Sequence, residues 1–173
     1  MKKVLLSVMV LMMAVIVVAG NVKMDSASLA VAKGLVAEKK TVEATAYALT
    51  LDMSTGVGGV EWLPVAVALE NYYWAMAICE QAKDKIGQFK YAKLYLLGNY
   101  QELSNVVATL DRVGSINFED TEITPEIQLK FLQAVNAKYL RFLTSATDCP
   151  WRPLITALQG QIKQMKEDMG LNK

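Results

Sequence analysis

Glu70 is the carboxylate with the clearest chemical potential in the chain. It lies within an apolar stretch, residues 62–79, where burial would raise the pKa of its carboxyl group. The simpler interpretation, which we favour, is that Glu70 and Asn71 occupy the solvent-facing strip of a helix. No second carboxylate stands at a spacing that would support paired acid–base catalysis. An enzyme that uses a buried carboxylate is therefore an alternative to a non-enzymatic protein, not the first expectation.

The chain of 173 residues contains no histidine. This composition excludes histidine-based zinc sites, histidine-ligated haem, and serine or cysteine catalysis that uses a histidine base. It also excludes covalent c-type haem, because that attachment needs a Cys-x-x-Cys-His motif. We therefore predict no catalytic, cofactor-binding or metal-binding residues.

Two cysteines, Cys79 and Cys149, are the only thiols. An even number of cysteines in an oxidising compartment favours a disulfide, so we predict a bond between them. Such a bond would close a loop of about 70 residues and could stabilise the fold by roughly 4 kcal/mol. The alternative is a pair of buried thiols that act as small core residues.

The compartment is indicated by the first twenty residues. Lys2 and Lys3 precede an apolar run, residues 4–19, which only Ser7 interrupts and which ends in the small residues Ala19 and Gly20. This layout is typical of a bacterial secretory signal peptide, residues 1–20. The run is shorter than the roughly 20 residues of a membrane span. We expect Sec-type export to the periplasm or medium, and membrane contact only if the segment stays as an uncleaved anchor.

The charge balance argues against nucleic acid as a partner. Without residues 1–20 the chain has 16 basic and 17 acidic side chains, with no long basic tract. A nucleic-acid-binding protein normally shows a basic patch or stripe. The remaining residues, 21–173, are enough for one domain with a hydrophobic core.

The first two expected helices frame a glycine-rich break. Asp25 and Ser26 are good N-cap residues for a helix over about residues 26–54, where an apolar seam recurs every seven residues. Residues 55–59 contain three glycines and predict a reversal of the chain. A second helix, apolar on nearly all sides, begins near Trp62, with Pro64 in its first turn.

The rest of the chain repeats the helical spacing of apolar residues. The segment Leu97–Leu103, followed by Val107 and Leu110, resembles the turn and second helix of a tetratricopeptide repeat. The resemblance covers about residues 95–110, has no second copy in the chain, and implies a local helix hairpin. At Gly98 the spacing favours one continuous helix, whereas the capping residues favour two. Thr124-Pro125-Glu126 is a strong helix start.

These patterns predict an all-α fold: an antiparallel helical bundle or stacked helix hairpins, with four to six helices in one domain over residues 21–173. No segment shows the alternation of a β-strand. The aromatic residues that gather in the middle of the chain, together with the carboxylate among them, form a candidate groove for a ligand or partner. Its expected residues are Trp62, Glu70, Tyr73, Trp74 and Tyr95.

We therefore expect an exported, non-enzymatic helical protein of the bacterial envelope that acts as an interaction or scaffold module. The surplus of apolar side chains in residues 57–79 favours a protein partner or self-association. The first alternative is a periplasmic carrier of a small apolar or aromatic ligand, with the aromatic region as its pocket.

Overall fold

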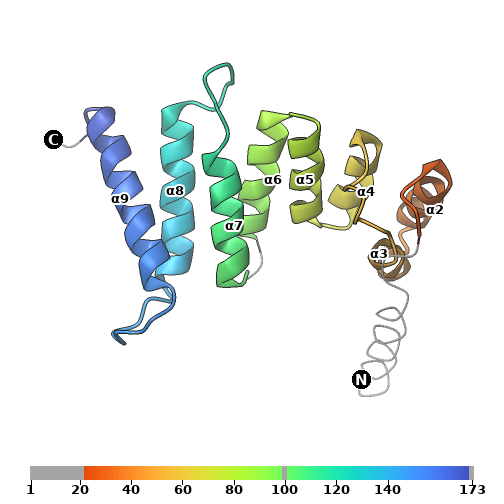
Figure 1. Ribbon diagram of the computed structural model, residues 1–173, viewed down its shortest axis with the longest axis horizontal. Helices are drawn as coiled ribbons and strands as arrows, with labels where there is room; N and C mark the ends of the chain where they lie inside the picture. Colours follow the sequence, from red (N-terminus) through yellow and green to blue (C-terminus); the bar gives the residue numbers. More distant parts are fainter. Residues whose placement is uncertain (1–21, 99–100, 172–173) are drawn as a thin grey trace. The chain divides into compact units, whose positions relative to one another are not determined.

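The computed structural model describes residues 22–98 and 101–171, and its regular elements there are helices (Figure 1). They are α2 (Ser26–Ala37), α3 (Thr41–Leu49), the 3₁₀ helix η1 (Val60–Trp62), α4 (Leu63–Ala68), α5 (Tyr72–Gln81), α6 (Lys85–Leu97), α7 (Leu103–Gly114), α8 (Pro125–Leu140) and α9 (Arg152–Asp168). One isolated bridge joins Val22 to Leu51 without forming a strand. The all-α prediction is confirmed. The predicted signal peptide, residues 1–20, lies outside the described residues.

The described ranges contain eight α-helices, so the prediction of four to six helices is wrong. Two segments that the apolar spacing predicts as single helices are each divided by a residue with positive φ. Lys39, with φ of 56°, separates α2 from α3, and Glu70, with φ of 54°, separates α4 from α5. This left-handed position usually belongs to glycine, so neither residue type signals a helix end in the sequence.

Both interruptions are closed by the same backbone hydrogen-bond pattern. Lys40 donates its amide to the carbonyl of Leu35 at 3.0 Å, and Asn71 donates to Ala66 at 2.9 Å. Each bond reaches back five residues across the left-handed residue and pairs a carbonyl that the helix end would leave unsatisfied. The next helix then begins at once, so each pair of helices is joined by only three residues.

The chain forms two compact units, one ending at Ala82 and the other beginning at Lys83. This division falls inside the segment 21–173 that the sequence predicts as one domain. In the N-terminal unit, α2 packs against α3 and α4, and α4 packs against α5. Its start follows the prediction, since Asp25 is the N-cap of α2 and accepts a hydrogen bond of 2.9 Å from the Ser28 amide.

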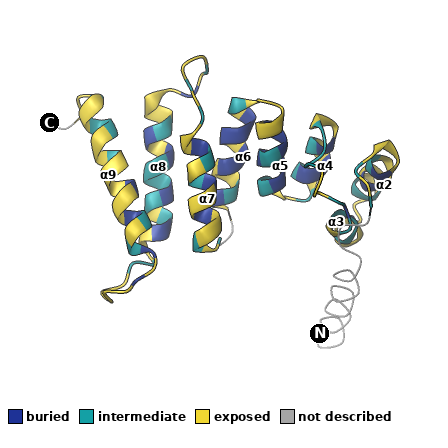
Figure 2. Cartoon of the chain, viewed as in Figure 1, coloured by how far each residue is buried: buried dark blue, intermediate teal, exposed yellow. Residues whose placement is uncertain are grey.

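In the C-terminal unit, α6 packs against α7 and α8, and α8 packs against α9. Figure 2 shows long buried faces on α6 and α8, whereas α9 is exposed over most of its length. Helix α6 ends at Leu97 and α7 begins at Leu103, so two helices, not one, flank Gly98. As predicted, α8 begins at Pro125 with Thr124 as its N-cap. No helix in the described part of the chain is long and apolar enough to cross a membrane.

Candidate functional site

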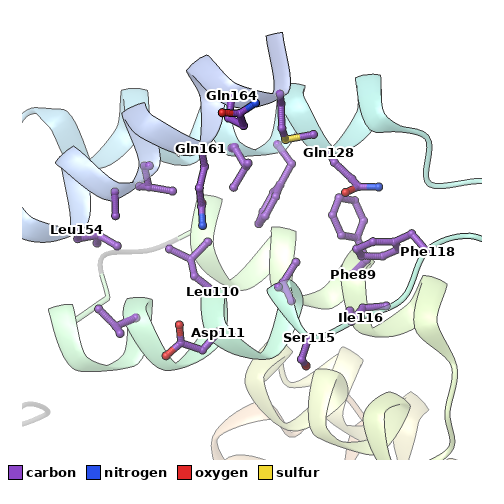
Figure 3. Close-up of a pocket in the computed structure, with 18 residues that line it drawn as sticks. Phe89, Leu110, Asp111, Ser115, Ile116, Phe118, Gln128, Leu154, Gln161 and Gln164 are labelled. Atoms are coloured by element: carbon purple, nitrogen blue, oxygen red, sulfur yellow. The ribbon is translucent and has the colours of Figure 1, made fainter. Parts of the chain in front are cut away.

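A cavity with a volume of about 710 Å³ lies in the C-terminal unit. We call it the α7–α9 groove, because α7 and α9 form its two sides and α8 contributes its floor (Figure 3). It is lined by Phe89, Val107, Leu110, Asp111, Val113, Gly114, Ser115, Ile116, Phe118, Gln128, Phe131, Leu132, Leu154, Ala157, Leu158, Gln161, Gln164 and Met165. Its volume falls in the range of about 300–1,000 Å³ that is usual for ligand sites.

The floor of the groove comes from the helical spacing of α8. Gln128, Phe131 and Leu132 lie three and four residues apart, so they share one face of the helix. Phe131 is buried, whereas Leu132 and Gln128 are half-buried. The groove thus presents an apolar surface that the fold does not fully cover.

The α7 side of the groove is formed by part of one broad apolar face of this helix. Val106, Val107, Leu110 and Val113 recur at spacings of three, four and seven residues, so they share that face. Val107, Leu110 and Val113 line the groove. Val106 and Val113 are buried, with exposed fractions of 0% and 6%, whereas Val107 is 38% exposed.

The α9 side combines apolar and amide side chains. Leu158 is buried, Leu154 and Met165 are half-buried, and Gln161 and Gln164 are exposed at the edge. Within the described ranges α7 and α9 do not pack closely on each other, since α7 rests on α6 and α9 on α8. The groove is the space that this arrangement leaves between them.

One end of the groove is aromatic. The ring of Phe89 makes edge contacts with Phe131, at 5.1 Å between centroids, and with Phe118, at 5.5 Å. Phe118 belongs to the loop between α7 and α8, and its carbonyl accepts a hydrogen bond of 2.8 Å from the Thr121 hydroxyl. The Gln128 amide donates to the carbonyl of Ile123 at 3.1 Å. These two bonds tie the loop to itself and to the start of α8 beside the aromatic end.

The polar side chains of the groove are few. Gln164 donates to Asp168 at 2.8 Å, and the Ser115 hydroxyl donates to the carbonyl of Arg112 at 2.7 Å. Asp111 and Gln161 have no side-chain hydrogen bond or ion pair to any residue that the structure describes. A mainly apolar site with a few polar groups is suited to bind and orient a ligand.

The residues that the sequence predicts as a groove do not line this one. Trp62 and Trp74 are buried, with exposed fractions of 1% and 3%, and their rings lie 5.8 Å apart in the core of the N-terminal unit. The Trp74 indole donates a hydrogen bond of 2.8 Å to the carbonyl of Val57. Both tryptophans therefore serve the fold, and a ligand could not reach them without disturbing the core.

The other three expected groove residues are more accessible. Glu70 is exposed, but it lies at the turn between α4 and α5 and not on the solvent-facing strip of a helix that the sequence favours. Tyr73 on α5 and Tyr95 on α6 are half-buried and belong to different units. A cavity of about 490 Å³ in the N-terminal unit involves Leu49, Leu51, Leu69 and neighbouring residues, and none of the five predicted residues lines it.

Cys79 and Cys149 are buried thiols in the structure and are not joined, so the predicted disulfide is absent. Cys79 lies on α5, and Cys149 lies just before α9. A hydrogen bond from the Thr144 backbone lowers the pKa of the Cys149 thiol below its usual value of 9.0, against the opposing effect of burial. The interpretation of both cysteines as small core residues fits their burial.

The described residues contain no group of three or more cysteine, aspartate or glutamate side chains placed to hold a metal ion. The comparisons with known proteins give no relative: no family model matches the chain, and no curated protein or solved structure is significantly similar to it.

Proposed function

We propose that this chain is an exported, non-enzymatic binding module of the bacterial envelope that holds a segment of a protein partner in the α7–α9 groove. In this proposal the signal peptide is cleaved and the remaining helices form a bundle of helix hairpins. The proposed binding site is the α7–α9 groove in the C-terminal unit, and not the aromatic groove that the sequence predicts.

The observation that carries the proposal is the pair of apolar residues that α7 presents to the groove. Val107 and Leu110 line the groove, and Val107 is 38% exposed although it shares the apolar face of α7 with the buried Val106 and Val113. Opposite them, Leu154 and Met165 of α9 are only half-buried. Apolar surface that the fold leaves accessible is typical of an interaction site.

Photo-crosslinking with a matched pair of positions tests the proposal. Gln161 lines the groove, whereas Gln159, on the same helix and also exposed, does not. A photoreactive phenylalanine analogue would replace each glutamine in the full chain, expressed in a bacterium with its own N-terminal segment. We expect a defined protein adduct from position 161 in the periplasmic or secreted fraction, and a much weaker adduct from position 159.

The identity and the position dependence of the adduct decide the outcome. Mass spectrometry of the crosslinked peptide would show whether a partner protein or a second copy of this chain is attached. Equal adducts at both positions, or none at position 161, would refute the groove as the binding site. Recovery of the intact chain from the cytosol would refute export.

A small apolar or aromatic ligand is the second candidate, and the aromatic end of the groove favours it. Phe118, which is half-buried, forms a cluster there with the buried Phe89 and Phe131 and could pack against an aromatic ring. Native mass spectrometry of the purified protein distinguishes the two candidates. A ligand-carrier would show added mass of a few hundred daltons, whereas a protein-binding module would show the mass of the chain alone.

A further inference from the structure

Two polar side chains, Asp111 on α7 and Gln161 on α9, line opposite sides of the α7–α9 groove and have no hydrogen bond or ion pair within residues 22–98 and 101–171. Figure 3 shows Gln161 extending from α9 toward Leu110, the neighbour of Asp111 on α7. Asp111 can only accept hydrogen bonds when ionised, whereas the Gln161 amide can donate and accept. Both side chains are exposed to solvent, so a ligand that replaces water at both must offer a donor to α7 and either group to α9.

Among the described residues that line the groove, Asp111 is also the only one with a charged side chain. The formal charge of this lining is therefore negative, and it opposes a carboxylate or phosphate within the groove. A fatty-acid anion would match the apolar floor but not this charge. A peptide with an N–H group or a basic side chain near Asp111 matches both.

The size of the groove, its length together with its volume, favours an extended peptide segment over a helix. Its α9 side runs from Leu154 to Met165, which corresponds to roughly 16 Å at 1.5 Å per residue. A helix of that length, about 10 Å across, would occupy roughly 1,300 Å³, so much of it would lie outside the groove, whose volume is about 710 Å³. About five residues in an extended conformation span the same 16 Å. Their N–H and C=O groups point to both sides, where Asp111 and Gln161 lie.

We propose that the α7–α9 groove binds an extended peptide segment of about five residues, apolar in most positions, with a basic residue placed at Asp111. Its main chain forms hydrogen bonds with the amide of Gln161, and its apolar side chains pack on the half-buried Leu110, Leu132 and Leu154. This inference rests on the proposed function, because it specifies the partner segment that the same groove holds.

Selection from a random heptapeptide library displayed on phage tests this inference, with the full chain purified after export as the bait. We expect enrichment of one Lys or Arg flanked by Leu, Ile, Val or Phe in adjacent positions. A synthetic peptide from the selection should lose about tenfold in affinity when its basic residue is changed to Glu, since each 1.4 kcal/mol corresponds to a factor of ten.

Two variants assign the preference to the groove. Asp111→Asn keeps the size of the side chain and should remove the preference for the basic residue, whereas Asp148→Asn, an exposed position outside the groove, should leave it unchanged. Enrichment of acidic residues, apolar residues spaced three and four apart, an unchanged preference in Asp111→Asn, or no enrichment at all would overturn the inference. If one of these outcomes is found while the crosslink from position 161 to a protein persists, the proposed function stands. Only the inference of an extended segment with a basic residue is then wrong.

Discussion

The hydroxyl of Tyr139 on α8 donates a hydrogen bond of 3.1 Å to the carbonyl of Leu96 at the end of α6. The ammonium group of Lys138 donates to the same carbonyl at 2.7 Å and to the carbonyl of Gly98 at 3.0 Å. The last carbonyls of a helix have no partner within it, and a cation near them interacts favourably with the helix dipole. Side chains from α8 thus close the C-terminal end of α6 and fix the helix that forms the groove floor.

Replacement of Tyr139 by Phe removes one of these bonds and keeps the ring, which is fully buried and stacks on Trp151 at 5.2 Å. We expect the free energy of unfolding to fall by about 1 kcal/mol, because a buried hydrogen bond is lost and, among the described residues, Lys138 remains as the side-chain donor to the Leu96 carbonyl. Urea denaturation measures this. Tyr47→Phe is the control, since the Tyr47 hydroxyl has no hydrogen bond to the described residues. Equal effects of the two changes would contradict the role of Tyr139.

Lys39 and Lys33 give opposite expectations for the same substitution. Lys39 has φ of 56° at the end of α2, a conformation that costs a non-glycine residue roughly 1–2 kcal/mol, and glycine loses part of that advantage through its chain entropy. Lys39→Gly should therefore stabilise the protein by about 0.5–1 kcal/mol. Lys33→Gly, in the exposed interior of α2, should destabilise it by about 1 kcal/mol. Loss of stability in both variants, measured by thermal unfolding, would show that Lys39 does not adopt the left-handed conformation.

Gly58 and Gly34 form a second contrasting pair. A Cβ atom on Gly58 would lie 2.6 Å from Cδ1 of Trp62 and 2.7 Å from Cε of Met24, and the φ of Gly58 is +77°. Gly58→Ala should reduce stability by about 2–4 kcal/mol through backbone strain and overpacking. Gly34→Ala places the methyl group in open space within α2 and should increase stability by up to about 1 kcal/mol. Circular dichroism melting curves check both, and a tolerated Gly58→Ala would refute the close packing of this turn on Trp62.

Asp25 predicts a pH dependence of stability. The backbone amide and side chain of Ser28 lower the pKa of Asp25 below its usual value of 3.8. The Asp25 carboxylate therefore binds a proton more readily in the unfolded chain than in the folded protein. Its contribution to the free energy of unfolding is complete above pH 3.8 and is lost as the pH falls through the lower pKa of the folded protein. Asn at this position keeps the N-cap acceptor and does not titrate. We expect the melting temperature of Asp25→Asn to fall less between about pH 7 and pH 3 than that of the wild type, and an equal fall would count against the capping contribution.

Local sequence patterns were sufficient for the helix class and for several helix starts. Asp25 caps α2 and Thr124 precedes α8, as their residue types predict. The ends of α2 and α4 could not be predicted in the same way. Lys39 and Glu70 take the left-handed position because the chain must turn there to pack the next helix, and their side chains do not require it.

The groove could not be predicted because its residues come from four helices and one loop. Phe89, Leu110, Phe131 and Leu158 all lie on apolar stripes that the helical spacing reveals, but a stripe does not distinguish a core contact from a groove lining. Trp62 and Trp74 show the opposite error: their size and polar N–H groups suggest a binding site, whereas packing buries both rings. Only the placement of α7 on α6 and of α9 on α8 decides between these outcomes.

The most direct test of the central claim, that the α7–α9 groove is the binding site, is the yield of the Gln161 crosslink in two variants of α8. Leu132 lines the groove and is half-buried, whereas Leu140 lies on the same helix, is 41% exposed and does not line it. Leu132→Lys should reduce the crosslink at least tenfold, because a charged group would lie on the apolar floor, and Leu140→Lys should leave it unchanged. An undiminished crosslink in Leu132→Lys, with the melting temperature of both variants retained, would contradict the account.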